Sequence, residues 1–196
     1  MPREAWPIVR TYTVRSLDHA AGEMAIDFVV HGDLGVAGPW ALAAQPGDVL
    51  VFMGPGGAYS PSPEADAHVL VGDEAALAAI AAALERVAAG VPVHAYVQVD
   101  GPDDEMALVT DADLSLRWLH RDAGEDLVTA VQGADWPAGT VHAFVHGETG
   151  EVKPCAGTWS TSAASTATGC RSRATGAAVP TRTRSRRRSA REVVPG

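Results

Sequence analysis

The segment HVLVGDE at residues 68–74 decides the fold of this chain, because it runs from a short apolar strand directly into a tight turn. An alanine-rich stretch from Ala75 to Ala89 follows, with the composition of a helix. Apolar residues then alternate from Val91 to Val99, as in a second strand. A strand, a helix and a strand in this order are typical of a parallel sheet.

The same alternation continues downstream. Leu114 to Leu119 and Val141 to Val145 read as further strands, with a helical stretch around Glu125 to Val131 between them. We therefore expect a small doubly wound α/β domain over residues 65–153.

The upstream third of the chain has a different pattern. Apolar residues alternate from Glu23 to His31, a helix is expected to start near Pro39, and another strand is expected from Val49 to Met53. Glycine and proline interrupt these pieces, as in antiparallel sheets, and the Ser-Pro repeat at residues 60–63 reads as a linker. The expected fold class is thus α+β with two domains, the first being a partial antiparallel β-barrel over residues 1–64.

Composition limits the classes of function. The chain is 46% apolar and 20% charged, which is typical of a soluble globular protein, and no long apolar run predicts a membrane span or a secretory signal. We expect a cytoplasmic protein. Residues 1–149 carry 6 basic and 22 acidic side chains, which argues against nucleic acid as the main partner. Cys155 and Cys170 have no metal-binding spacing.

A short motif near the start carries the first chemical signal. In the run RTYTVR at residues 10–15, an extended strand would place Arg10 and Tyr12 on one face, where a planar cation and an aromatic ring can address one ligand. Thr13 would have its hydroxyl free to donate. An ordinary barrel strand with a charged edge explains the hexapeptide equally well.

This run is the first of four motifs whose order along the chain resembles that of a known protein family. RTYTVR at 10–15, DFVVHG at 27–32, GVAGPWA at 35–41 and GDE at 72–74 together resemble the siderophore-interacting protein family of FAD-dependent ferric-siderophore reductases, in the ferredoxin reductase-like superfamily. The resemblance runs from about Val9 to about Lys153. It implies a flavin-binding barrel followed by a nicotinamide-binding domain, with FAD and NAD(P)H as cofactors and a ferric siderophore as the small-molecule acceptor.

The resemblance also implies roles for the flavin-binding residues. Arg10 would hold the FAD pyrophosphate, Tyr12 would cover the flavin or its ribityl chain, and Thr13 would act near the reactive edge. The phosphate cradle would be completed by His31, Gly35, Ala37, Gly38 and Trp40. His31 at a strand end and Trp40 as a core anchor are the structural alternatives.

For the nicotinamide side, the resemblance assigns Gly72, Asp73 and Glu74 to NAD(P)H binding and places Glu148 near the meeting point of nicotinamide and flavin. A plain polar turn explains Gly147-Glu148 nearly as well. Where the family continues with Thr-Ala-Leu-Pro, residues 75–78 are AALA, so a hydroxyl and a proline are missing from the NAD(P)H contacts.

The other charged and histidine residues are expected to have less specific roles. His142 and His146 fall in a predicted strand, and no metal site is expected. Arg15, Arg117 and Arg121 are candidates for the basic surface that would meet the acceptor.

Both ends depart from the family pattern. Only nine residues precede Arg10, so about half the barrel strands are absent from the sequence, and an exposed barrel edge would allow oligomers. Residues 154–196 read as a disordered basic tail. An alternative reading frame of this tail permits short motifs similar to those at the family's C-terminus. We therefore hypothesise a frame shift near Lys153 or Pro154, and sequencing of the gene would test it.

These observations lead to one main function and two alternatives. The main one is a siderophore-interacting FAD-binding oxidoreductase that uses NAD(P)H to reduce ferric siderophores and release iron. The first alternative is a catalytically inactive fragment of this family that retains only a nucleotide- or partner-binding α/β domain. The second is a genuine basic tail that binds RNA or an acidic surface.

Overall fold

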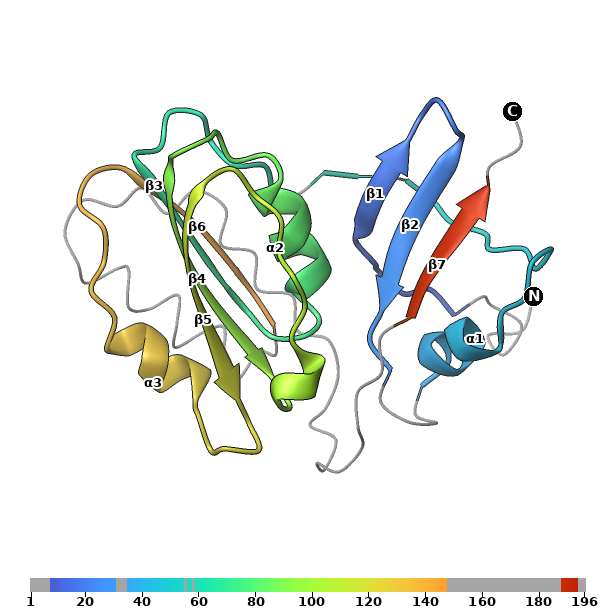
Figure 1. Ribbon diagram of the computed structural model, residues 1–196. Coiled ribbons are helices and arrows are strands. Elements are labelled where there is room, and N and C mark those ends of the chain that lie inside the picture. Colours follow the sequence, from blue (N-terminus) through green and yellow to red (C-terminus); the bar gives the residue numbers. More distant parts are fainter. Residues whose placement is uncertain (1–7, 31–34, 55, 58, 148–187, 194–196) are drawn as a thin grey trace.

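The computed structural model describes residues 8–30, 35–54, 56–57, 59–147 and, for the backbone alone, 188–193. These residues form two separate sheets (Figure 1). A three-stranded sheet has the order β1-β2-β7, and a four-stranded sheet has the order β5-β4-β3-β6. The fold is therefore a mixed α/β fold with few helices.

The three-stranded sheet begins with a hairpin. Strands β1 (Val14–Asp18) and β2 (Glu23–Phe28) pair antiparallel. The Asp18 carboxylate accepts the backbone N–H groups of Ala20 and Ala21 at 2.9 and 3.0 Å, and Gly22 has a φ of 67°, which a side chain would disfavour. The turn between the strands is thus set by local hydrogen bonds and one glycine.

Helix α1 (Ala37–Ala43) follows β2. Pro39 lies in its first turn, where the missing N–H of proline costs no hydrogen bond, so the expected helix is confirmed with a start two residues earlier. Ala41 is buried with Phe28 and Val30, and Trp40 contacts Phe28. The helix therefore packs on the carboxyl end of β2.

The four-stranded sheet is entirely parallel. Its strands are β3 (Ala67–Gly72), β4 (Pro92–Val99), β5 (Asp113–His120) and β6 (Val141–His146). These are the four strands expected from the sequence. Helix α2 (Leu77–Leu84) follows β3, the 3-10 helix η2 (Pro102–Asp104) lies between β4 and β5, and α3 (Leu127–Gln132) lies between β5 and β6.

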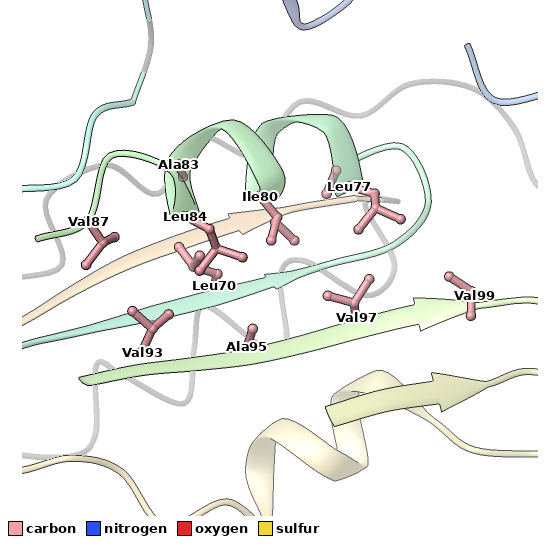
Figure 2. Close-up of a cluster of buried hydrophobic side chains, with 11 residues drawn as sticks. Leu70, Leu77, Ile80, Ala83, Leu84, Val87, Val93, Ala95, Val97 and Val99 are labelled. Carbon is pink, nitrogen blue, oxygen red and sulfur yellow. The ribbon is translucent and has the colours of Figure 1, made fainter. Parts of the chain in front are cut away.

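Each face of this sheet carries its own apolar core. Figure 2 shows Leu77, Ile80 and Leu84 of α2 pointing toward the strands, where β4 presents Val93 and Val97. On the other face, α3 packs against alternate residues of β3, β5 and β6. That second core consists of Val69, Val71, Leu119, Leu127, Ala130, Val131, Val141, Ala143 and Val145. The central strand β3 is buried along its whole length, as central parallel strands usually are, whereas the edge strand β5 alternates exposed polar residues with apolar ones.

Helix α2 also faces the other sheet. In Figure 1 it lies between the parallel sheet and β1, and Arg15 of β1 donates to Glu85 just after α2, with 2.6 Å between Nη2 and Oε1. The two sheets therefore meet through α2.

Three expected elements differ from the structure. Val49 to Met53 has no strand structure, and Val51 and Met53 are each 86% exposed, because no strand among the described residues pairs with this segment. Residues 10–13 lie outside β1, which starts at Val14 where pairing with Ile26 begins. The helix expected from Ala75 to Ala89 is confined to α2, and turns follow it.

The expected disorder of the whole segment 154–196 is wrong for residues 188–193. These form β7 (Arg188–Val193), which pairs antiparallel with β2. The physical reason is that β2 has N–H and C=O groups on its outer edge that need partners, and backbone pairing places little demand on sequence. The partial barrel and the division into two domains remain predictions.

Among the described helices, none is long and apolar enough to cross a bilayer.

Candidate functional site

Three aromatic rings join the first expected motif to helix α1. The Tyr12 ring centroid lies 4.6 Å from that of Phe28, and Phe28 lies 5.9 Å from Trp40. Phe28 is 3% exposed, whereas Tyr12 is 38% exposed. The buried Phe28 ring thus packs against one side of the Tyr12 ring, and part of the tyrosine surface remains available to a planar ligand.

Arg10 and Thr13 lie on either side of this tyrosine in the chain. Arg10 is exposed, and its Nη1 donates to the backbone oxygen of Val9 at 3.0 Å. Partial burial raises the pKa of Tyr12, and the positive charge of Arg10 opposes that rise. Thr13 is half-buried immediately before β1. A cation, an aromatic ring and a hydroxyl thus lie close together along the chain immediately before β1.

The amino end of α1 is the expected phosphate cradle. Gly35 has a φ of 80° and is exposed, and Val36 at the N-cap position provides no side-chain cap. Ala37 and Gly38 are the first helical residues. Gly38 is buried, and a Cβ there would lie 3.6 Å from the Val29 oxygen, in ordinary contact. Backbone N–H groups with no side-chain acceptor suit an anion chemically.

A second group of expected residues lies at the carboxyl edge of the parallel sheet. Gly72 ends β3, opposite Val97 of β4 and His146 of β6. A Cβ on Gly72 would lie 2.5 Å from the His146 oxygen and would overlap with the Ala76 side chain. Only glycine fits here, so the turn that follows is drawn tightly between the neighbouring strands.

Asp73 connects this turn to the end of β6. It is 8% exposed, and its Oδ1 accepts the N–H of Ala75 at 2.9 Å. A Cβ on Gly147, directly after β6, would lie 3.0 Å from Asp73 Oδ2. The ends of β3 and β6 are therefore in contact. Because β4 and β6 lie on opposite sides of β3, this contact marks the topological switch point where ligands of such sheets bind.

Glu74 is part of an ion-paired cluster. It is 6% exposed, and Arg121 Nη1 donates to its Oε1. The same Nη1 lies 3.0 Å from Oδ1 of Asp100, which directly follows β4. Arg121, a candidate for the acceptor surface, is therefore paired with two carboxylates in this structure. Arg15, another such candidate, pairs with Glu85.

The sequence interpretation missed Asp100. The signal was present, since an acidic residue directly after the second strand of a strand-helix-strand unit is a feature of dinucleotide-binding sheets. Its partner Arg121 directly follows the next strand, β5, and only the three-dimensional structure shows that the two meet.

His31 and Glu148, both predicted site residues, lie outside the described residues. His142 has a structural role: its Nδ1 accepts the N–H of Ser62 at 3.0 Å, and its ring stacks on Tyr59 with 4.8 Å between centroids. Within the described parts of the chain, no three acidic, histidine or cysteine side chains are grouped as a metal site requires.

One surface hollow of about 430 Å³ lies between β5 and α3. Its lining includes Arg117, the remaining candidate for contact with an acceptor, together with Glu125, Asp126 and Thr129. None of the residues assigned to FAD or NAD(P)H lines it, so it is separate from both groups described above.

Comparison with known families matches both halves of the chain. The family model described as the siderophore-interacting FAD-binding domain matches residues 1–59, and the one described as the siderophore-interacting protein matches residues 65–163. The first range contains the Tyr12 cluster and α1. The second contains the parallel sheet.

Curated relatives show the same similarity. An uncharacterized protein of Mycobacterium tuberculosis is 46% identical over 160 residues, which cover 76% of this chain and 56% of that protein. The ferric vibriobactin reductase ViuB of Vibrio cholerae is 36% identical over 154 residues, which cover 76% of this chain and 57% of ViuB. The chain thus spans little more than half the length of these relatives.

Solved structures agree in fold. The siderophore-interacting protein SipS from Aeromonas hydrophila superposes with a TM-score of 0.72 at 30% identity, covering 88% of this chain and 68% of SipS. A siderophore utilization protein from T. fusca gives a TM-score of 0.67 at 32% identity, covering 81% of this chain and 62% of that one.

Proposed function

The chain belongs to the siderophore-interacting protein family, and on that premise we propose that it binds FAD, accepts electrons from NAD(P)H and reduces ferric siderophores, which releases their iron. The observation that carries the proposal is the supported, partly exposed Tyr12 ring within the segment that matches an FAD-binding domain. Both the activity and the acceptor are proposals, since the chain spans 56–57% of the relatives named above.

The residues near Tyr12 fit the parts of FAD. Arg10 and the backbone N–H groups at the start of α1 would bind the pyrophosphate, and the exposed part of the Tyr12 ring would pack on the flavin or its ribityl chain. Thr13 would donate a hydrogen bond near the reactive edge of the flavin. Bound FAD would supply the conversion from hydride transfer to single-electron transfer.

The carboxyl edge of the parallel sheet fits NAD(P)H. Gly72 allows the turn to pack closely against the end of β6, and the contact between Asp73 and Gly147 marks the crevice at the switch point. Glu74 is held by Arg121 and would keep the turn in place. We propose this edge as the nicotinamide dinucleotide site, with Glu148 beside the reacting groups as the family resemblance implies.

Reduction of the metal explains how iron would leave a siderophore. Fe(II) is held less tightly than Fe(III) by the hard oxygen ligands typical of siderophores, so electron transfer alone weakens the complex and the chelator need not be cleaved. Among the three arginines suggested for the acceptor surface, Arg117 is exposed, and Arg15 and Arg121 are ion-paired. Arg117, however, lines the hollow between β5 and α3, apart from the residues assigned to FAD, so none of the three arginines is preferred as the contact with the acceptor.

Flavin retention tests the proposal most directly. The full chain would be mixed with FAD, freed of unbound cofactor and examined by visible absorbance. We expect retention in the wild type, a loss in Arg10→Ala and Tyr12→Ala, and near-normal retention in Tyr12→Phe, which keeps the ring. Arg86→Ala, an exposed arginine after α2, is the matched charge control.

Activity would be tested on the flavin-loaded chain with NADH or NADPH, a ferric trihydroxamate and a chromogenic Fe(II) chelator. Formation of the Fe(II) complex is the expected result. No flavin retention by a chain with native circular dichroism would contradict the proposal. That result would favour the alternative of an inactive fragment that keeps a nucleotide- or partner-binding α/β domain, which the two complete cores of the parallel sheet support.

A further inference from the structure

The strand order of the parallel sheet identifies the position that faces an adenosine ribose. From β3, the chain passes through α2 to the adjacent parallel strand β4, so β3, α2 and β4 form a strand-helix-strand unit whose first turn is residues 72–74. In dinucleotide-binding sheets, an acidic residue at the end of the second strand accepts a hydrogen bond from the ribose 2′-hydroxyl. In this chain, that position is Asp100.

The setting of Asp100 suits an acceptor. Its side chain is 33% exposed, and Oδ1 lies 3.0 Å from Arg121 Nη1. Its backbone oxygen accepts the N–H of Asp122 at 3.0 Å, and Arg121 bonds in the same way to Val99, so the ends of β4 and β5 are held together. A carboxylate accepts several hydrogen bonds, so Asp100 can keep its bond to Arg121 and still bind a hydroxyl.

The charge at this edge disfavours an additional phosphate. Arg121 is shared between Asp100 and the buried Glu74. Asp122 is also close, since a Cβ on Gly101 would lie 2.8 Å from its Oδ2. A 2′-phosphate would bring about two further negative charges to a place where Glu74 and Asp100 already share one guanidinium and Asp122 lies beside Gly101.

From this geometry we infer that Asp100 makes the site selective for NADH over NADPH. The inference rests on the proposed function, because it concerns the dinucleotide of that reaction. The 2′-hydroxyl of NADH donates to Asp100, whereas the 2′-phosphate of NADPH cannot donate when ionised and is repelled. Arg121 acts as a positioning residue that fixes the Asp100 carboxylate.

The test uses oxidised NAD⁺ and NADP⁺, which do not reduce the flavin, and measures binding to the full chain by titration calorimetry. We expect NAD⁺ to bind about tenfold or more tightly than NADP⁺, as the loss of a hydrogen bond to a charged group implies. Asp100→Asn should narrow that ratio severalfold. Asp113→Asn, the same charge change on an exposed residue at the opposite end of β5, should leave it unchanged.

Each other result has a distinct meaning. Equal binding, or tighter binding of NADP⁺, overturns the inference and leaves the proposed function standing. An unchanged ratio in a folded Asp100→Asn variant overturns the role of Asp100. If neither dinucleotide binds the folded chain, both the inference and the nicotinamide part of the proposed function are overturned. Asp100→Ser would be the second variant if Asp100→Asn fails to fold.

Discussion

Arg15 of β1 and Glu85 after α2 form an ion pair across the two sheets, with 2.6 Å between Nη2 and Oε1 and side-chain exposures of 18% and 41%. The residues are 70 positions apart in sequence, so this contact depends on the relative position of the sheets. The strength of this ion pair therefore measures how firmly β1 contacts the helix that covers the parallel sheet.

The first prediction concerns this pair. A double-mutant cycle of Arg15→Ala and Glu85→Ala should give a coupling energy of about 0.5–1 kcal/mol in urea unfolding, falling as salt is added, because the pair is partly exposed. Arg86→Ala, which removes an exposed neighbouring arginine, should change stability by less than about 0.5 kcal/mol. Zero coupling at low salt would contradict a stable contact between the sheets.

Gly72 carries the second prediction. Gly72→Ala should destabilise the chain by about 1–3 kcal/mol, because the new methyl group meets the His146 backbone oxygen and the Ala76 side chain, neither of which can yield cheaply. It should also weaken dinucleotide binding, since the turn would shift. Gly56→Ala is the control, because nothing lies within 4 Å of the Cβ it would add. Equal stability of the two variants would show that β3 and β6 are less closely packed than described.

The parallel sheet was the part of the fold most open to prediction from sequence. Its strands are short apolar or alternating segments bounded by turns, and these patterns, with the helical stretches between them, indicate a parallel sheet. Val49 to Met53 has the same apolar character but no partner strand among the described residues, and pairing is not visible in a local pattern. The pairing of β7 with β2 was missed because it depends on backbone groups rather than on side chains.

The candidate site was predictable to a similar degree. The turn at residues 72–74 was found because a strand leads directly into it. The partners of Glu74 were not, since Arg121 lies 47 positions away and is brought close only by the order of the strands. The sequence named Arg121 as a candidate for the acceptor surface, and only the fold shows its ion pairs with Glu74 and Asp100.

The third prediction concerns pH and His68, which lies on β3 opposite His142 of β6. His68 is 2% exposed, and among the described residues its Nδ1 has no hydrogen-bond partner; the two rings meet at 5.8 Å between centroids. Burial, and secondarily the neighbouring His142, lowers the pKa of His68. The folded chain therefore favours the neutral ring more strongly than the unfolded chain does.

The direction of the pH dependence of stability follows from proton uptake by the unfolded chain. Below the ordinary histidine pKa of about 6.5, the unfolded chain binds the proton first, so stability is full above that pH and falls as the pH drops toward the lowered pKa. Urea unfolding at about pH 7 and about pH 5 should show a smaller loss for His68→Leu than for the wild type. His19→Gln, at an exposed turn, should behave as the wild type. An identical loss in His68→Leu would assign the pH dependence to other groups.

The last prediction concerns the start of α3, where Asp126 is the N-cap residue. Its Oδ1 accepts the N–H of Thr129 at 2.8 Å and the hydroxyl of Thr129 at 2.6 Å, and these bonds, the hydroxyl first, lower the pKa of Asp126. Asp126→Ala should cost about 1 kcal/mol of stability, and Asp126→Asn, which keeps an oxygen acceptor, much less.

The stabilisation by Asp126 depends on its carboxylate being ionised. Because the folded pKa is lowered, the stabilisation is present above the ordinary aspartate pKa of about 3.9 and is lost as the pH falls through the lowered value. The difference in unfolding free energy between the wild type and Asp126→Asn should therefore shrink in acid. A difference that stays constant from about pH 7 to about pH 3 would show that the ionised carboxylate does not stabilise the helix. Since α3 covers the second core through Leu127 and Val131, loss of this cap should also loosen the sheet face beneath it, which hydrogen exchange at β5 would detect.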